Sequence, residues 1–303
     1  MKIAEALQQA QTALLPLQDS IALEVTLAFV LKKDKSFLFV HPEFELKEEQ
    51  IQAFSDLVDR LKIGEPLAQI IGVKEFYGRD FAVNEHVLIP RPESEFLVEY
   101  VVNWVKNVKN VNNVEKVRNV KDVKNVKIST NADGVRILDV GTGSGNILLS
   151  ILKELPSARG VGVDVSNEAL KMAQKNLLLL QMESQAQLME SFLMEKVEGE
   201  FNVVVANLPY IGTETFNFVS DNTFKFEPHV ALFGGSDGLE LYRQLFQQLN
   251  DRKSLPELFL GEFGFGQSEK MQELLTEYFP QCKRQIIQDY AGIDRVFVVH
   301  NLH

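Results

Sequence analysis

The feature that most constrains the fold is the run Val135-Arg-Ile-Leu-Asp139-Val140, which the glycine loop Gly141-Thr-Gly143-Ser-Gly145 follows directly. A short, mostly aliphatic run of this kind is typical of a buried strand, and an apolar helical stretch begins after the loop. Glycine permits positive φ angles and lets a ligand approach the main chain closely. Three alternating glycines exceed what a simple turn needs, so the loop is predicted to bind a ligand.

The chain around this loop alternates strand-like and helix-like segments. Helices are expected between the strands, for example at Glu168–Leu180 and Leu239–Asn250. This alternation predicts an α/β fold with a doubly wound, mostly parallel, Rossmann-like sheet. The predicted strands are Val135–Val140, Gly160–Val165, Phe201–Ala206, Leu258–Phe263 and Val296–His300.

The N-terminal part of the chain has a different character. A length of 303 residues favours two domains, at about 150 residues per domain. Apolar residues recur at helical spacing in this part, as at Leu23, Leu27 and Leu31. We predict a helical domain over residues 1–72, a connecting β-hairpin over 73–90 with its turn at Asn84-Glu85, and a second domain over 91–303.

One segment of the second domain fits neither pattern. Between residues 103 and 127, valine recurs at every third position from Val105 to Val126, with Lys and Asn between. Steps of three wind around the whole of a helix, so these valines would form no apolar face. We predict a solvated, low-complexity insertion over 103–127. The alternative is a basic arm that contacts RNA, because seven basic and two acidic residues give the segment a charge of +5.

Charge and hydropathy exclude several classes of protein. The net charge is −11, and it is −16 once the +5 of residues 103–127 is set aside. Direct nucleic-acid binding is therefore not expected, because it needs clustered Lys and Arg. The single cysteine, Cys282, excludes a disulfide framework, and no metal site is predicted. The start lacks a signal-peptide core, and the longest apolar stretch is far shorter than a membrane-spanning helix. We expect a soluble, cytoplasmic monomer without membrane contact.

The spacing of the glycines limits the ligand. Asn146 stands where a dinucleotide fingerprint has its third glycine, and no Lys-Ser/Thr pair follows to hold a phosphate. The D-x-G-x-G-x-G pattern instead resembles the first motif of the methyltransferases that use S-adenosyl-L-methionine, a cofactor without phosphates. Asp164 ends the next strand, where a carboxylate can accept both hydroxyls of a ribose.

A second motif lies at the end of the strand Phe201–Ala206. Asn207-Leu208-Pro209-Tyr210 falls at a carboxyl strand end, where ligands of open α/β sheets bind. An asparagine oxygen and the following main-chain carbonyl can accept the two N–H bonds of a planar amide or amine. That orients its nitrogen toward a methyl donor, and Tyr210 offers a flat surface beside it. The competing interpretation is a plain turn after a strand.

Several motifs in order resemble the HemK/PrmC family of peptide chain release factor glutamine methyltransferases. The Asn207–Tyr210 motif is similar to the [N/D]-P-P-[Y/F] signature of amino-methyltransferases. The resemblance covers nearly the whole chain outside residues 103–127. The other motifs that carry it are Gly64–Gly72, Glu75–Gly78, Val87–Glu93, Glu227–Leu239, Gly261–Gln267 and Asp294–Val296.

The resemblance implies a class I methyltransferase domain and a small N-terminal helical domain that recognises the release factor. It implies transfer of a methyl group to N5 of the glutamine in a Gly-Gly-Gln loop. Arg91 and Glu93 are expected to shape the pocket or to form a structural ion pair. The resemblance assigns cofactor contacts to Gly141, Thr142, Gly143, Ser144, Gly145, Asp164, Phe192 and Asn207, and the acceptor site to Asn207, Leu208, Pro209 and Tyr210.

Two departures from the family pattern and three alternatives accompany this assignment. Leu208 replaces the first proline of the motif, and Ser191, beside Glu190, stands where many members have an aspartate. The alternatives are a glutamine methyltransferase of a ribosomal protein, an adenine-N6 methyltransferase acting on DNA or RNA, and a scaffold that binds cofactor without catalysis. The intact Asn207 and Tyr210 argue against the scaffold.

Overall fold

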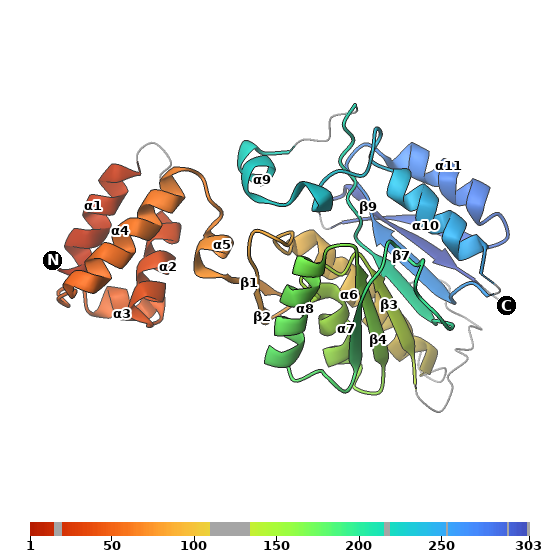
Figure 1. Cartoon of the computed structure of the whole chain (residues 1–303), viewed down its shortest axis with the longest axis horizontal. Coiled ribbons are helices and arrows are strands. Elements are labelled where there is room, and N and C mark those ends of the chain that lie inside the picture. The colour runs from red at the N-terminus through yellow and green to blue at the C-terminus, as the bar shows by residue number, and fades with distance from the viewer. Residues whose placement is uncertain (15–19, 110–133, 215–218, 253, 290, 302–303) are drawn as a thin grey trace. The chain divides into compact units, whose positions relative to one another are not determined.

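A computed structural model describes residues 1–14, 20–109, 134–214, 219–252, 254–289 and 291–301. These residues form two compact units (Figure 1). The first contains residues 1–73 together with 220–226, and the second contains residues 74–219 and 227–303. The sequence did not predict that 220–226 belongs with the N-terminal helices. The predicted domain boundaries at residues 72 and 90 stay a prediction.

The first unit is helical, as predicted, and is built around one apolar core. Leu23, Leu27 and Leu38 are buried in that core with Phe54 and Val58. The Gln69 side chain donates a hydrogen bond of 2.9 Å to the main-chain oxygen of Phe226, which ties the segment 220–226 to this unit. Its helices are α1 (Ile3–Ala13), α2 (Ser20–Leu31), α3 (Lys35–Val40), α4 (Glu48–Lys62), α5 (Leu67–Ile71) and α9 (Asp221–Phe226).

The second unit contains a seven-stranded sheet in the order β5-β4-β3-β6-β7-β9-β8. The first five strands in this order are parallel, and β9 pairs antiparallel with both β7 and β8. The mostly parallel sheet confirms the prediction, although β5 and β8 were not predicted. The strands are β3 (Arg136–Val140), β4 (Arg159–Asp164), β5 (Ala186–Glu190), β6 (Val203–Ala206), β7 (Leu258–Glu262), β8 (Lys283–Gln288) and β9 (Asp294–His300).

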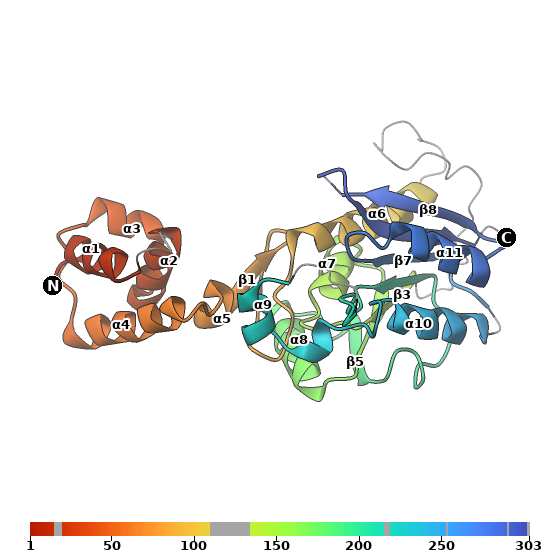
Figure 2. The ribbon, with the colours of Figure 1, turned by 90° about the horizontal axis from the view of Figure 1, so that it is seen from above.

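Helices cover both faces of this sheet (Figure 2). On one face, α6 (Glu95–Lys109), α7 (Asn146–Glu154) and α8 (Asn167–Leu179) pack on alternate strand residues such as Ile137 and Val203. On the other face, α10 (Glu240–Asn250) and α11 (Ser268–Tyr278) pack on the residues between them, such as Leu138 and Val204. Because successive strand residues point to opposite faces, one aliphatic run supplies both cores.

The β-hairpin forms at a different turn from the one predicted. β1 (Val73–Phe76) and β2 (Arg79–Ala82) form a two-stranded sheet closed by Tyr77-Gly78, whose φ angles are 51° and 69°. Two positive φ angles are what a tight hairpin turn requires. Asn84-Glu85 lies beyond the hairpin, where the Asn84 side chain accepts a 3.0 Å hydrogen bond from the main-chain N–H of His86. The prediction of the turn at Asn84-Glu85 was therefore wrong.

Helix α6 continues past residue 103, where the insertion was predicted to begin, and ends at Lys109. Trp104 and Val105 are buried against the sheet, which explains why the helix does not end at residue 102. The predicted insertion is wrong over 103–109, and residues 110–127 lie outside the described residues. Within the described part of the chain, we find no helix with the length and apolar character needed to span a membrane.

Candidate active site

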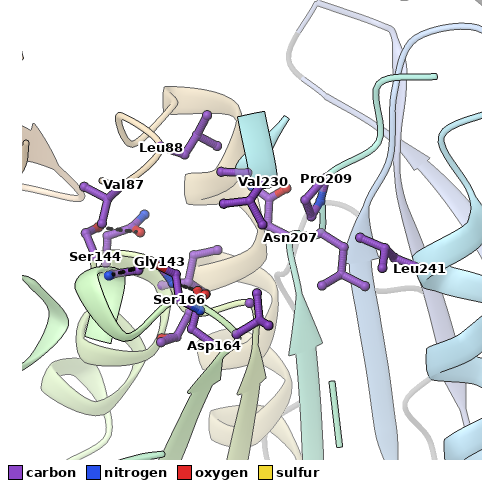
Figure 3. A pocket seen from close by; sticks show the side chains of 18 of the residues that line it. Val87, Leu88, Gly143, Ser144, Asp164, Ser166, Asn207, Pro209, Val230 and Leu241 are labelled. Carbon is purple, nitrogen blue, oxygen red and sulfur yellow. Dashed lines mark hydrogen bonds between the residues drawn. The ribbon is translucent and has the colours of Figure 1, made fainter. Parts of the chain in front are cut away.

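The site lies where the strand order of the sheet reverses direction. The chain runs from β3 outward to β4 and β5, and then returns to place β6 on the other side of β3. The loops after β3 and β6 therefore diverge, which leaves a crevice at the carboxyl ends of the strands. The glycine loop follows β3, Asp164 ends β4, and Asn207 follows β6. These segments, distant in sequence, line one pocket (Figure 3).

Most of the predicted site residues line this pocket. They are Gly141, Thr142, Gly143, Ser144, Asp164, Phe192, Asn207, Leu208 and Pro209. Gly145 and Tyr210 are not among the lining residues. Gly145 instead stands directly before α7, with a φ of 80°. The hydroxyl of Tyr210 donates a 3.0 Å hydrogen bond to the buried Glu262, a contact that the sequence did not predict.

The glycine loop is held at one end and open at its middle. The main-chain N–H groups of Gly141 and Thr142 both donate 2.9 Å hydrogen bonds to the carbonyl of Val163. Gly143 has a φ of 54°, and a Cβ atom added there would meet no described atom within 4 Å. The loop therefore presents bare main chain to the pocket.

Asp164 connects two main-chain segments at the pocket wall. One carboxylate oxygen accepts a 2.9 Å hydrogen bond from the N–H of Gly143, and the other accepts one of the same length from the N–H of Ser166. Burial raises the pKa of Asp164, while these N–H groups oppose the rise. Each carboxylate oxygen can accept more than one hydrogen bond, so Asp164 retains capacity to bind a ligand hydroxyl.

Asp139 is a buried carboxyl beneath the glycine loop. It is 1% exposed, and it accepts a 2.7 Å hydrogen bond from the Thr142 hydroxyl. Burial raises the pKa of Asp139 to about 7, and the Thr142 hydrogen bond offsets part of that rise. The group is thus easier to ionise in the unfolded chain than in the folded one.

This pKa shift predicts a pH-dependent difference between the protein and its Asp139→Asn variant. The stabilising contribution of protonated Asp139 is fully present below the unfolded pKa, near 4, and is lost as pH rises through 7. The isosteric amide does not titrate, so the stability of Asp139→Asn relative to wild type should rise between pH 4 and 7. The slope should be about 1.4 kcal/mol per pH unit. Urea unfolding of both proteins from pH 5 to 8 measures the difference, and a constant value would contradict the assignment.

Two buried side chains brace the pocket walls, and the sequence assigned a role to neither of them. Asn176 on α8 donates to the carbonyls of Ser144 and Ala82, at 2.8 and 3.0 Å, and accepts from the N–H of Ala82 at 2.7 Å. It therefore joins the glycine loop to the end of β2. Glu227 accepts a 2.9 Å hydrogen bond from the N–H of Ile89 and forms an ion pair with Arg91. Arg91 lines the pocket, and its ion-pair partner is Glu227.

The Asn207 side chain is the most constrained polar group at the site. Its Nδ2 donates to Ser94 Oγ at 2.8 Å and to Glu262 Oε2 at 3.2 Å. Ser94 Oγ in turn donates to the same Glu262 oxygen at 2.6 Å. Asn207 Oδ1 is buried and accepts no hydrogen bond from any residue that the structure describes. A buried acceptor without a donor is costly, so this oxygen marks a place for a ligand N–H.

Neighbouring residues pack closely against the backbone of the motif after Asn207. The N–H of Leu208, which the usual proline lacks, lies 3.5 Å from the Tyr242 hydroxyl. Gln267 Nε2 donates to the carbonyl of Tyr210 at 2.8 Å. Gly234 is so close that a Cβ atom there would lie 2.1 Å from the carbonyl oxygen of Pro209. These contacts fix the course of the main chain through the motif.

Many of the remaining pocket residues come from two segments, and the sequence did not predict most of them individually. The segment before α6 contributes His86, Val87, Leu88 and Pro90. The residues after Glu227 contribute Val230, Ala231 and Phe233, and Ser191 stands beside Phe192. The sequence features that indicated these walls were the Pro90-Arg91-Pro92 segment and the run Glu227-Pro-x-x-Ala-Leu232. Glu93 does not line the pocket.

Known proteins resemble this chain over nearly its full length. It is 33% identical over 280 residues to the release factor glutamine methyltransferase of Koribacter versatilis, covering 92% of this chain and 90% of that protein. It is 32% identical to the Bacillus cereus enzyme of the same name, covering 98% of each. The catalytic domain of human METTL16 shares the fold at a TM-score of 0.54 and 11% identity, covering 82% of this chain and 81% of that one.

The sheet order and the glycine loop define a methyltransferase that uses S-adenosyl-L-methionine as its cofactor. The family described as PrmC N-terminal domain matches residues 5–72, and the methyltransferase small domain matches residues 124–225. The chain belongs to the HemK/PrmC family, and the relatives from Koribacter versatilis and Bacillus cereus are named release factor glutamine methyltransferases.

Proposed function

We propose that this enzyme methylates N5 of the glutamine in the Gly-Gly-Gln loop of peptide chain release factors. The observation that carries the proposal is Asn207 Oδ1, a buried acceptor at the pocket without a described donor. A primary amide is planar and can donate an N–H to this oxygen. The names of the relatives supply the release factor as the protein that bears it.

The pocket residues fit the cofactor in their chemistry. Gly143 offers main chain without a side chain, Asp164 offers carboxylate oxygens for ribose hydroxyls, and Val165 and Phe192 offer apolar surface for a base. No lysine lines the pocket among the described residues, which suits a ligand without phosphates. When bound, the cofactor supplies an electrophilic methyl group on a sulfonium.

In the proposed reaction, the residues of the chain orient the substrate amide. We assign one N–H of the substrate amide to Asn207 Oδ1 and the other to the carbonyl of Leu208, which directs the amide nitrogen at the methyl group. Methyl transfer to the amide would place positive charge on its nitrogen, and the Asn207 and Leu208 oxygens that accept its N–H groups would face that charge until the proton passes to solvent. Oxygen acceptors fixed beforehand stabilise that charge without reorganising during the reaction. This placement of reactants lowers the entropic part of the barrier.

A labelling assay tests the proposed substrate. We expect the purified protein to transfer labelled methyl groups to a release factor, and expect no transfer when the loop glutamine is replaced by alanine. Mass spectrometry then locates the added methyl group on that glutamine. Equal labelling of the substituted factor would contradict the proposal. Transfer to a ribosomal protein or to nucleic acid, with none to any release factor, would support the corresponding alternative instead.

A further inference from the structure

We propose that Glu262 and Ser94 are positioning residues that fix the orientation of the Asn207 amide and so make the acceptor pocket selective for a glutamine amide over a glutamate carboxylate. This inference rests on the proposed function, and it concerns the specificity of that same pocket. Glu262 stands at the end of β7, where it is 2% exposed and neighbours the end of β6.

The direction of each hydrogen bond around Glu262 follows from its chemistry. Burial raises the pKa of Glu262, while hydrogen bonds from Ser94 and Tyr210 and the nearby charge of Arg295 oppose that rise, and we take the carboxylate as ionised. An ionised carboxylate only accepts hydrogen bonds. Three donors converge on it: Tyr210 Oη at 3.0 Å on one oxygen, and Ser94 Oγ at 2.6 Å and Asn207 Nδ2 at 3.2 Å on the other. Because the single Ser94 proton is directed at Glu262, the Ser94 oxygen is left to accept from Asn207, at 2.8 Å.

These directions leave Asn207 with one orientation. Both of its Nδ2 protons have acceptors, one on Ser94 and one on Glu262. Turning the amide over would place Oδ1 against the carboxylate of Glu262 and the oxygen of Ser94, where lone pairs would face lone pairs. The amide oxygen must therefore point away from Glu262, and it is the oxygen that has no described donor.

An acceptor fixed in this way distinguishes two side chains of nearly equal shape. A glutamine amide can donate an N–H to Asn207 Oδ1, whereas an ionised glutamate has none to give. A glutamate would also bring a second negative charge close to the buried Glu262. Sites built to hydrogen-bond one polar group reject isosteres that leave their own buried groups unpaired. Free rotation of Asn207 would remove this discrimination, because its NH₂ group could then serve a carboxylate.

The test compares Glu262→Gln with a matched control, Glu257→Gln. Glu257 precedes β7 at the opposite end of the same strand and accepts a 3.3 Å hydrogen bond from Asn202, which precedes β6. The two substitutions are the same, and each affects a carboxylate that accepts from an asparagine. A glutamine at 262 offers both a donor and an acceptor, so it no longer dictates the orientation of Asn207. Ser94→Ala removes the second acceptor and is measured alongside.

The first readout is the ratio between Ki for a release factor with glutamate in its loop and KM for the same factor with glutamine. We expect this ratio to fall at least about tenfold in Glu262→Gln, with a fall in kcat/KM of about 10- to 100-fold. Glu257→Gln should keep the wild-type ratio. A loss of kcat/KM in Glu262→Gln with the wild-type ratio retained would overturn the specificity role, because a merely structural defect lowers activity without improving glutamate binding.

The second readout needs no substrate. In protein labelled with ¹⁵N-asparagine, the Asn207 side-chain signal is identified by its loss in Asn207→Ala. Its two protons should shift in Glu262→Gln and in Ser94→Ala, and stay unchanged in Glu257→Gln. Unchanged signals in the first two variants would refute the proposed orientation. If the wild-type protein labels no release factor, the proposed function fails while this measurement still decides the role of Glu262 and Ser94.

Discussion

Asn207→Ala is expected to lower kcat for methyl transfer by on the order of 10²–10³-fold, the typical effect of removing one preorganised polar group that faces a reacting atom. Among the described residues, the Asn207 oxygen is the side-chain acceptor that lies buried at the acceptor end of the pocket without a donor. Alanine leaves the substrate amide free to rotate about its own bonds. The Leu208 carbonyl alone does not define the plane of the amide.

Cofactor affinity should be largely retained in Asn207→Ala, because the glycine loop and Asp164 lie on β3 and β4 rather than on β6. Calorimetry with S-adenosylhomocysteine measures this affinity beside the kinetics. Asn202→Ala is the control, since Asn202 accepts a 2.8 Å hydrogen bond from the N–H of Arg136 at the other end of the sheet. It should lose stability without a specific loss of kcat. Lost cofactor affinity with kcat unchanged in Asn207→Ala would contradict this division of roles.

Gly234→Ala is expected to lower kcat/KM by about 100-fold, because a displacement near 1 Å in a positioned group can cost that much. The new Cβ atom would lie 2.1 Å from the Pro209 carbonyl oxygen and 2.7 Å from the carbonyl oxygen of Gly238. Both are main-chain atoms, so neither can rotate away as a side chain would. The Pro209 peptide must move, and it adjoins the Leu208 carbonyl proposed to accept the second substrate N–H.

Gly266→Ala separates this steric effect from the general cost of replacing a glycine. Gly266 has a φ of 78°, and a Cβ atom there would meet no described atom within 4 Å. Its substitution strains one residue by roughly 1 kcal/mol without moving the motif. Kinetics and thermal unfolding of both variants are compared. Activity of Gly234→Ala equal to that of Gly266→Ala would show that the Pro209 carbonyl does not need its present position.

The sequence predicted those parts of the fold that depend on local pattern. Aliphatic strands such as Val135–Val140 carry two buried faces and are recognisable without their neighbours. β8 was missed because Lys283–Gln288 is an edge strand with half-buried, polar residues and no aliphatic run. β5 has the same character at the other edge. The hairpin turn was misplaced because Tyr77 adopts a positive φ, which its residue type does not predict.

The sequence likewise predicted some residues of the candidate site and missed others. The glycine loop, Asp164 and Asn207 carry motif signals, and the structure brings them to one pocket. Glu262 lies in the Gly261–Gln267 motif, but its role, like those of Ser94 and Asn176, is not visible in local sequence. These roles arise from contacts across 55, 113 and 32 residues of sequence. A buried carboxylate that accepts from an asparagine has no local spacing to reveal it. The partners of a motif residue therefore have to come from the three-dimensional structure.

The division of the chain into two units has a consequence for any attempt to separate them. The backbone passes between the units three times, at residues 73–74, 219–220 and 226–227, so no single cut yields two intact pieces. Residues 1–73 alone would leave Gln69 without its acceptor on Phe226. The remainder would carry α9, too short to persist alone, immediately before Glu227, the side chain that holds Ile89 and Arg91 at the pocket. Phe226, the last residue of the helical unit, is therefore followed directly by Glu227, which holds the pocket. Each unit should be studied in the presence of the other.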